Sequence, residues 1–345
     1  MAEQRIRNAQ VKGSSPFIGS INRGVAQLGS AFGSGPKGRV FKSPRPDQND
    51  MHNKPLQGTE LCSGLFLLSI RVLFCFLPIL LTTHLPNDRI EQKGGFLMNY
   101  LKINKDNIDR EHICCAMSGK QSLVKKEWMK QRFDEGLVFY RSEERGKCFI
   151  EYIPAENAWV PIDADGYIYI NCLWIAGALK GHGYSEALLS ECIRDAEQQN
   201  KQGVCILSAE GRKKEFLSDP KYLAHKGFIV ADTSDCGITL MYLPLKSTAV
   251  PPKFKECAKH PAVEEKGFVL YFTDQCPFTC YWVPRVREAA NAHDIPLKVI
   301  HVTDREEAQN VPAPVTTYAL FRDGKFVTHA IQSDKKFLAL AGVRE

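Results

Sequence analysis

One segment near the middle of the chain restricts the fold more than any other. The stretch Gly166–Ile175 is rich in β-branched and aromatic residues, the glycine-containing Ala178–Ser185 follows it, and Ser185–Gln199 has helical periodicity. Strand-forming residues, a glycine turn and a helical pattern in that order predict a strand that passes directly into a helix. A passage of this kind is typical of α/β folds, and we expect one here.

The residues between Met98 and about position 246 continue this alternation and predict one domain with a mixed sheet, 98–246. Helices are expected over Ile103–Cys114, Leu123–Gly136, Ser185–Gln199 and Asp219–Lys226, and strands over Leu137–Arg141, Lys147–Tyr152, Gly166–Ile175, Gly203–Ser208, Phe228–Ala231 and Thr239–Leu243.

A proline-rich stretch then separates a second, smaller α/β domain from the first. Residues 247–256 include Thr248-Ala249-Val250-Pro251-Pro252 and are typical of a linker. The domain expected over 257–345 has strands over Gly267–Phe272 and Leu297–Val302, helices over Thr279–His293 and Asp334–Ala341, and a hairpin formed by Pro312–Phe321 and Lys325–Ala330.

The first 97 residues are different. They are rich in Gly, Ser, Pro, Asn and Gln and have no sustained period before Leu65, which is typical of a disordered tail. Codons for Lys12–Pro16 and Val40–Pro44 can contain the conserved stretch of a tRNA T-arm, and codons for Lys93-Gly94-Gly95 can form a ribosome-binding site. We therefore expect 1–97 to be a non-native or disordered extension and Met98 to be the start.

The apolar stretch Leu65–Leu81 leaves a membrane anchor open as an alternative. A spanning helix needs about 20 apolar residues, and Arg71 near the centre of this stretch is costly in a bilayer. We expect no membrane association.

Charge and cysteine usage limit the class of protein. Residues 1–97 hold twelve Lys/Arg against six Asp/Glu, which accounts for the whole net charge of +6, whereas residues 98–345 hold 33 of each sign. The part expected to fold therefore lacks the basic footprint of a nucleic-acid-binding protein. Ten of the 12 cysteines follow residue 97 without a secretory signal or paired zinc-type spacing, which indicates free thiols, a cytoplasmic location and no metal.

The glycine turn itself predicts a phosphate site. The first amides of a helix lack partners and carry partial positive charge, so they bind anions. Gly181 and Gly183 let the backbone approach a ligand closely, and Lys180 adds a cation. The predicted cofactor-binding residues of this loop are Lys180, Gly181, His182, Gly183, Tyr184 and Ser185.

With Gly181, Gly183 and Tyr184 before the helix residues Glu186-Ala187-Leu188-Leu189, and with Tyr222–Phe228 downstream, residues 98–246 resemble the GNAT N-acetyltransferases. Ala178 departs from the Arg or Gln usual in that family. The resemblance implies that acetyl-CoA is the co-substrate, and that its pantetheine chain lies along Tyr169–Ile175 and faces backbone groups of Leu173 and Ile175.

The same resemblance implies an acid that protonates the CoA thiolate. The family often has a tyrosine four residues before its Gly-Phe pair, a position that is Leu223 here, so Tyr222 is the candidate and a packing role is its alternative. Glu151 and Asp163 are the candidate bases, each also explicable as a solvated carboxylate. Cys172 is expected to be a core residue.

A cysteine loop, Thr273–Trp282, follows a strand and begins a helix in the second domain. Cys276 at the helix N-terminus is expected to have a lowered pKa and is a candidate catalytic residue, with a buried structural thiol as the alternative. Thr279 occupies the position of the second cysteine in Cys-x-x-Cys proteins, which argues against a dithiol pair. With Val311–Thr316 before the hairpin, this domain resembles a thioredoxin-like fold. Its Cys276–Thr279 and Phe321–Phe326 elements are similar to the YoaP-type domain.

The sequence thus predicts a GNAT mixed-sheet domain followed by a smaller thioredoxin-like α/β domain. The expected function is transfer of an acetyl group from acetyl-CoA to an amine, either a small molecule or a peptide. The alternative is a thiol-redox or CoA-sensing protein that uses Cys276. The pattern does not select an acceptor or an oligomeric state.

Overall fold

The computed structural model describes residues 99–115, 119–144, 146–211 and 215–343. The predictions for residues 1–97, including the stretch Leu65–Leu81, lie outside these ranges. Within the described ranges, no helix is both long enough and apolar enough to cross a membrane.

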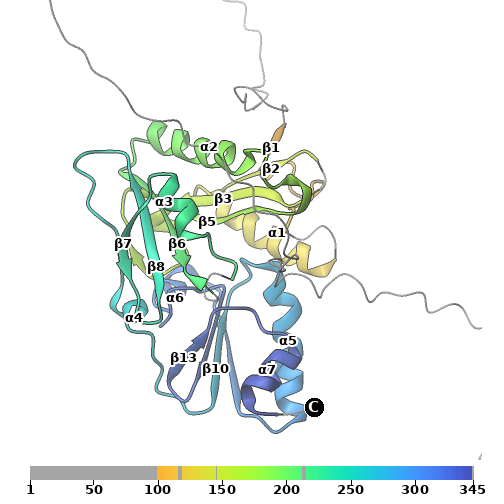
Figure 1. Ribbon diagram of the computed structural model, residues 1–345. Helices are drawn as coiled ribbons and strands as arrows, with labels where there is room; N and C mark the ends of the chain where they lie inside the picture. Colours follow the sequence, from red (N-terminus) through yellow and green to blue (C-terminus); the bar gives the residue numbers. More distant parts are fainter. Residues whose placement is uncertain (1–98, 116–118, 145, 212–214, 344–345) are drawn as a thin grey trace, which may run out of the picture. The chain divides into compact units, whose positions relative to one another are not determined.

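The first unit is built on a seven-stranded sheet with the order β1-β2-β3-β5-β6-β8-β7 (Figure 1). The β5–β6 pair is parallel and the other neighbours are antiparallel. The strands are β1 (Tyr100–Ile103), β2 (Val138–Ser142), β3 (Cys148–Pro154), β5 (Tyr167–Ile175), β6 (Gly203–Ala209), β7 (Ile229–Thr233) and β8 (Ile238–Pro244). The prediction of a mixed α/β sheet is confirmed.

Helices cover both faces of this sheet. Helix α2 (Tyr184–Gln198) lies on one face, where Leu188, Cys192 and Ala196 recur at four-residue spacing and are all fully buried. Helix α1 (Lys120–Phe133) and the short turn η1 (Ala155–Asn157) contribute to the separate core on the other face. Helix α3 (Pro220–His225) packs its Leu223 into the α2 side.

The helix expected over Ile103–Cys114 is absent, which makes that prediction wrong. Strand β1 ends at Ile103 and turns follow. The Asn104 side-chain oxygen accepts hydrogen bonds from the amides of Asp106 (2.9 Å) and Asn107 (3.2 Å). Asparagine and aspartate side chains compete in this way with the helical backbone hydrogen bonds, and this local run contains several of them.

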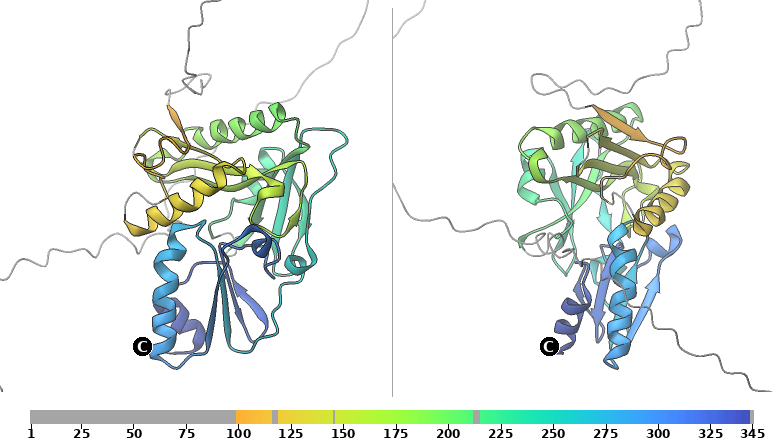
Figure 2. Two further views of the ribbon diagram at one scale, coloured as in Figure 1. Left: turned by 180° about the vertical axis from the view of Figure 1, so that it is seen from behind. Right: turned by 90° about the vertical axis from the view of Figure 1, so that its right-hand side faces the viewer.

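The second unit is a four-stranded sheet with the order β11-β10-β12-β13. Strand β10 pairs in parallel with β11, and the β10–β12 and β12–β13 pairs are antiparallel. Helices α5 and α7 lie side by side on one face, as both views of Figure 2 show. The elements are β10 (Phe268–Phe272), α5 (Pro277–Ala292), β11 (Leu297–His301), α6 (Arg305–Ala308), β12 (Tyr318–Arg322), β13 (Lys325–Thr328) and α7 (Asp334–Ala341). A thioredoxin-like relationship stays a prediction.

The stretch expected to be a linker is partly structured. Strand β9 (Lys253–Phe254) pairs with β4 (Ile162–Asp163) of the first unit, and α4 (Glu256–Lys259) follows. The Ser234 hydroxyl donates a hydrogen bond of 2.6 Å to the Ala258 carbonyl in α4. Residues 253–259 are therefore fixed to the first unit.

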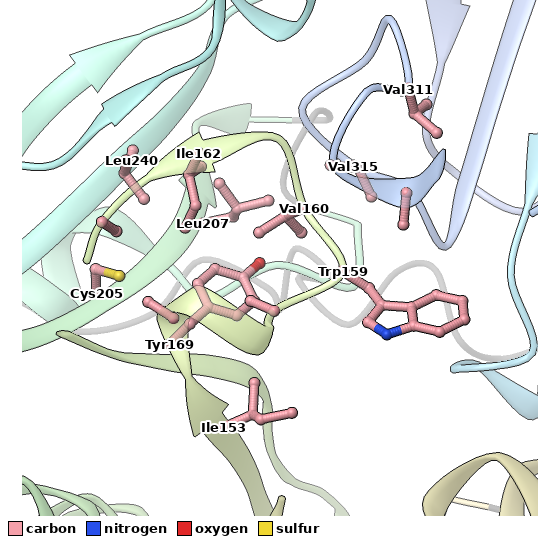
Figure 3. Packing of buried hydrophobic residues seen from close by; sticks show 14 of the residues in the cluster. Ile153, Trp159, Val160, Ile162, Tyr169, Cys205, Leu207, Leu240, Val311 and Val315 are labelled. Carbon is pink, nitrogen blue, oxygen red and sulfur yellow. The ribbon is translucent and has the colours of Figure 1, made fainter. Parts of the chain in front are cut away.

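The two units share one hydrophobic core. Trp159 and Val160 of the first unit belong to the same buried cluster as Val311 and Val315 of the second (Figure 3). The Thr316 hydroxyl donates to the Trp159 carbonyl, and the side-chain Nε2 of Gln309 donates to the Ala158 carbonyl at 2.9 Å. The second unit is thus packed against the first by apolar burial and hydrogen bonds as well as joined to it by the chain.

A substitution at Gly203, at the start of β6, tests how closely the sheet is packed there. An added Cβ would overlap the Leu243 carbonyl oxygen and lie 2.9 Å from the Tyr167 ring. We expect Gly203→Ala to lower the free energy of unfolding by about 1–3 kcal/mol, the usual cost of overpacking. The measurement is urea denaturation.

Gly146→Ala is the matched control, because its Cβ would meet only the flexible end of Leu179, at 2.8 Å. We expect it to change stability by less than about 0.5 kcal/mol. Equal stability of the two variants would contradict the packing described for β6.

Candidate active site

Strand β5 separates from β6 halfway along its length. The two strands pair from Tyr167–Gly203 to Ile170–Ile206, yet β5 continues to Ile175. The register with β3 shifts between Glu151 and Tyr152, so Asn171 is the extra residue of a β-bulge. Because a bulge bends and twists its strand, it explains the separation. Beyond this bulge, residues 172–175 pair with β3 on one edge and present an open backbone edge on the other.

The glycine loop lies at the end of this open edge. The turn η2 (Gly177–Leu179) follows β5, and Gly181 (φ +83°) and Gly183 (φ +78°) have left-handed backbone conformations that favour glycine. Gly183 is the N-cap of α2. Among the described residues, no acceptor takes a hydrogen bond from the amides of residues 181–185. The positive end of the 15-residue helix α2 and these free amides form an arrangement that suits a pyrophosphate.

The predicted cofactor-binding residues of the glycine loop differ in how far they are exposed. Lys180, Gly181, His182 and Gly183 are exposed and Ser185 is half-buried. The Tyr184 side chain is buried in the core and stacks with the His182 ring at 5.6 Å between centroids, so only its amide remains available for a ligand.

The two residues predicted to contact the pantetheine chain both lie on the part of β5 that has separated from β6. Leu173 and Ile175 lie on β5 beyond the point of separation and pack toward the α2 side of the sheet. Because neither is fully buried, both retain exposed surface next to the open edge.

Tyr222 is the tyrosine that α3 brings to the α2 side. Its hydroxyl oxygen is buried and has no hydrogen-bond partner among the described residues. The ring packs against the same apolar cluster as Leu173 and Ile175. Leu223, which occupies the family's usual tyrosine position, is fully buried and serves the core. A buried hydroxyl without a partner is costly, and a bound ligand would satisfy it.

Glu151 lies on the opposite side of the sheet and is 1% exposed. The Lys125 ammonium of α1 lies 2.6 Å from one carboxylate oxygen, and the Asn171 amide donates to the other at 3.0 Å. The Lys125 ammonium also lies 4.5 Å from the Trp128 ring centroid. Glu151 is therefore a buried, oriented carboxylate. Asp163 lies on the separate β4–β9 pair, where its side chain is half-exposed and 3.7 Å from the Lys253 ammonium, away from Glu151.

Cys276 is the N-cap of α5, as predicted. The structure brings it close to the Glu151–Lys125 pair, whose charges act on its thiol and on the thiols of Cys115 and Cys172. The predicted catalytic residues Glu151 and Cys276, which come from different units, thus lie in one neighbourhood. Cys172 is half-buried and part of this group as well as of the core.

The expectation of a lowered pKa for Cys276 is wrong. Burial raises the pKa of its thiol, and this effect exceeds the opposing influence of the Phe278 and Thr279 amides and of Lys125. Burial also raises the pKa of Cys280 to about 12, and its thiol donates to Asp274 at 3.4 Å. The Thr279 hydroxyl donates to the Thr273 carbonyl at 2.9 Å. Both cysteines are free thiols.

Sequence patterns did not reveal several residues of this neighbourhood. Lys125 and Asn171 hold the Glu151 carboxylate in place, yet neither residue belongs to a recognisable sequence motif. Their positions depend on how α1 packs against the sheet and on the bulge in β5, which form only in the folded protein. Trp174 and Phe278 contact each other across the two units at 6.4 Å between ring centroids. Among the described residues, no group of three His, Cys, Asp or Glu side chains is placed to hold a metal ion.

Comparison with known proteins identifies the family. The chain is 44% identical over 245 residues to the uncharacterized N-acetyltransferase YoaP of Bacillus subtilis (strain 168), an alignment that covers 70% of this chain and 97% of that protein. The chain belongs to the YoaP family of GNAT N-acetyltransferases. The family model described as YoaP-like matches residues 296–338, within the second unit. As a YoaP-family protein, the chain is an acyltransferase of the GNAT type, which confirms the resemblance inferred from the glycine loop.

Solved GNAT structures are similar to part of this YoaP-family chain. YhbS from Escherichia coli, in complex with CoA, is 11% identical, covers 48% of this chain and 94% of its own, and has a TM-score of 0.34. A GNAT acetyltransferase from Brucella melitensis, in complex with acetyl-CoA, is 13% identical, covers 43% and 88% respectively, and has a TM-score of 0.29.

The raised pKa of Cys276 leads to a test of its reactivity. Because the thiol is protonated and half-buried at neutral pH, we expect iodoacetamide to alkylate it more slowly at pH 7 than it alkylates N-acetylcysteine. The rate should increase as the pH rises, because a larger fraction of the thiol is then ionised. Mass spectrometry of the peptide that contains Cys276 gives the rate, and alkylation faster than that of the free thiol at pH 7 would contradict the pKa direction.

Proposed function

We propose that this enzyme transfers the acetyl group of acetyl-CoA to an amine at the open edge of β5. The observation that supports this most strongly is the coincidence of two features: the edge left by the separation of β5 from β6, and the free amides of residues 181–185 at its end. An extended chain with amide groups can add to the edge, and a pyrophosphate can bind the helix N-terminus. Acetyl-CoA contains both parts in that order.

In this proposal the backbone groups of Leu173 and Ile175 bind the pantetheine amides, and residues 180–185 bind the pyrophosphate. The thioester then lies near the beginning of the open edge, next to Asn171. The unpaired backbone N–H groups of β5 are available to stabilise the oxyanion of the tetrahedral intermediate. The chemistry requires the amine nitrogen to form a bond to the acetyl carbon, the carbon–sulfur bond to break, and one proton to move from nitrogen to sulfur.

Two side chains on opposite sides of the sheet suit the two proton transfers. The Tyr222 hydroxyl, which lacks a partner among the described residues, lies on the α2 side and is proposed to protonate the departing thiolate. The Glu151 carboxylate lies on the other side, and we propose that it takes the proton of the attacking amine, directly or through water. Asn171, the bulge residue, orients it.

The alternative of a thiol-redox or CoA-sensing protein is less well supported. Burial raises the pKa of Cys276, so the thiolate needed for redox chemistry is disfavoured at neutral pH. We propose that Cys276 has a structural role beside Glu151 and that the acceptor is a small-molecule or peptide amine.

The glycine loop is tested by Gly183→Trp. The side chain would enter the open space in front of the free amides, and we expect the Kd for acetyl-CoA measured by calorimetry to rise at least about tenfold, since each lost hydrogen bond to a charged group contributes about 1.5–3 kcal/mol.

Gly342→Trp is the matched control, because Gly342 also has a positive φ (+89°) and open space at its Cβ but lies at the end of α7. It should carry the same backbone strain and bind acetyl-CoA like the parent. Equal loss of binding in both variants, or in neither, would contradict the location of the site.

Tyr222 is tested by removing only its hydroxyl. We expect Tyr222→Phe to lower kcat by about 10²–10⁴-fold, the usual contribution of a general acid, with little change in stability because that oxygen has no partner among the described residues. Release of CoA from acetyl-CoA in the presence of an amine gives kcat.

Tyr100→Phe is the control for this deletion. The Tyr100 hydroxyl is likewise buried without a partner among the described residues, and its residue lies in the edge strand β1. Its kcat should equal that of the parent. A Tyr222→Phe enzyme with unchanged kcat would remove Tyr222 from the mechanism.

A further inference from the structure

The side of β5 that faces away from α2 is the side on which Glu151 lies. Cys172 and Trp174 lie opposite Glu151 and Phe149 of β3, and cross-strand partners point to the same side of a sheet. Leu173 points to the other side, which α2 covers. An amine that reaches both the thioester and Glu151 must therefore approach over Cys172 and Trp174.

The second unit extends to this side of the strand. The Phe278 ring of α5 lies 6.4 Å from the Trp174 ring and 6.3 Å from the Phe216 ring, between centroids. Phe216 belongs to the segment between β6 and α3, and the neighbouring Glu215 carbonyl accepts a hydrogen bond of 2.9 Å from His329 of the second unit. We call Trp174, Phe216 and Phe278 the aromatic face.

This face is accessible although it is made of large apolar rings. Phe216 is 49% exposed, and Trp174 and Phe278 are half-buried. The Lys147 ammonium lies 4.2 Å from the Trp174 centroid and 5.9 Å from that of Phe278. Three accessible rings from three separate segments form a surface on which another flat ring can stack.

The charges around the face argue against a polycationic acceptor. The Glu151 carboxylate beside the face is paired with Lys125, and burial raises the pKa of both the Cys172 and the Cys276 thiols, so the two thiols are uncharged at neutral pH. Lys147 adds a positive charge at the face. A polyamine or a lysine-rich peptide would therefore meet no excess of negative charge here.

We propose that the aromatic face binds the acceptor, and that the acceptor is a primary amine on a small aromatic frame. The second unit then completes the active site of the first, and Phe278 determines acceptor specificity. This inference rests on the acetyl transfer proposed above.

The test uses the full chain, acetyl-CoA and three probe amines: 2-phenylethylamine, n-butylamine and spermidine. We expect kcat/KM for 2-phenylethylamine to exceed that for either other amine by about tenfold or more, the worth of a well-packed ring. Phe278→Ala should raise the KM for 2-phenylethylamine several-fold without changing the calorimetric Kd for acetyl-CoA.

A second variant of the aromatic face and a control variant outside it complete the test. Phe216→Ala should have the same effect as Phe278→Ala, and its exposed side chain makes a folding defect an inadequate explanation. Leu340→Ala removes an apolar side chain of similar exposure (37%) from α7 and should change neither constant.

The possible results separate the two proposals. A parent protein that does not bind acetyl-CoA would overturn the proposed function and this inference with it. Binding of acetyl-CoA together with a preference for spermidine or n-butylamine, with no turnover of any probe, or with Phe278→Ala and Phe216→Ala behaving like Leu340→Ala, would overturn the inference alone.

Discussion

The separation of β5 from β6 after the Ile170–Ile206 pair is the constraint on which the site depends. A sheet that stayed paired to Ile175 would leave no backbone edge for a ligand, and the bulge at Asn171 prevents that pairing. The same bulge residue donates a hydrogen bond to Glu151. One local irregularity therefore opens the edge and orients the proposed base beside it.

The shared core explains how a second unit takes part in this chemistry. Burial of Trp159 and Val160 with Val311 and Val315 holds α5 against the first unit, so that Cys276 and Phe278 lie beside β5. The buried Glu151–Lys125 pair lies in the same region, where removal of one partner would leave an uncompensated charge at a cost of about 3–5 kcal/mol. Structure and proposed catalysis thus depend on the same contacts.

The sequence predicted the features that depend on local chemistry. The strand–glycine–helix passage at Gly181 and Gly183, the N-cap position of Cys276 and helix α7 follow from short-range patterns, and the structure has all three. Features set by tertiary packing were missed or wrong. The pKa of Cys276 depends on burial by the other unit. Turns stabilised by the Asn104 side chain form in place of the helix expected over Ile103–Cys114. The hydrogen-bond partners of Glu151 come from helix α1 and from the bulge in β5.

Hydrogen exchange of the full chain with and without acetyl-CoA tests the central claim most directly. The amides of residues 181–185 have no acceptor among the described residues, and the amides of residues 171–175 that face away from β3 lie on the open edge, so exchange of these amides should be fast in the free protein. We expect acetyl-CoA to slow exchange chiefly in these two segments, as the proposed site requires. Protection confined to other segments, or no change on binding, would contradict it.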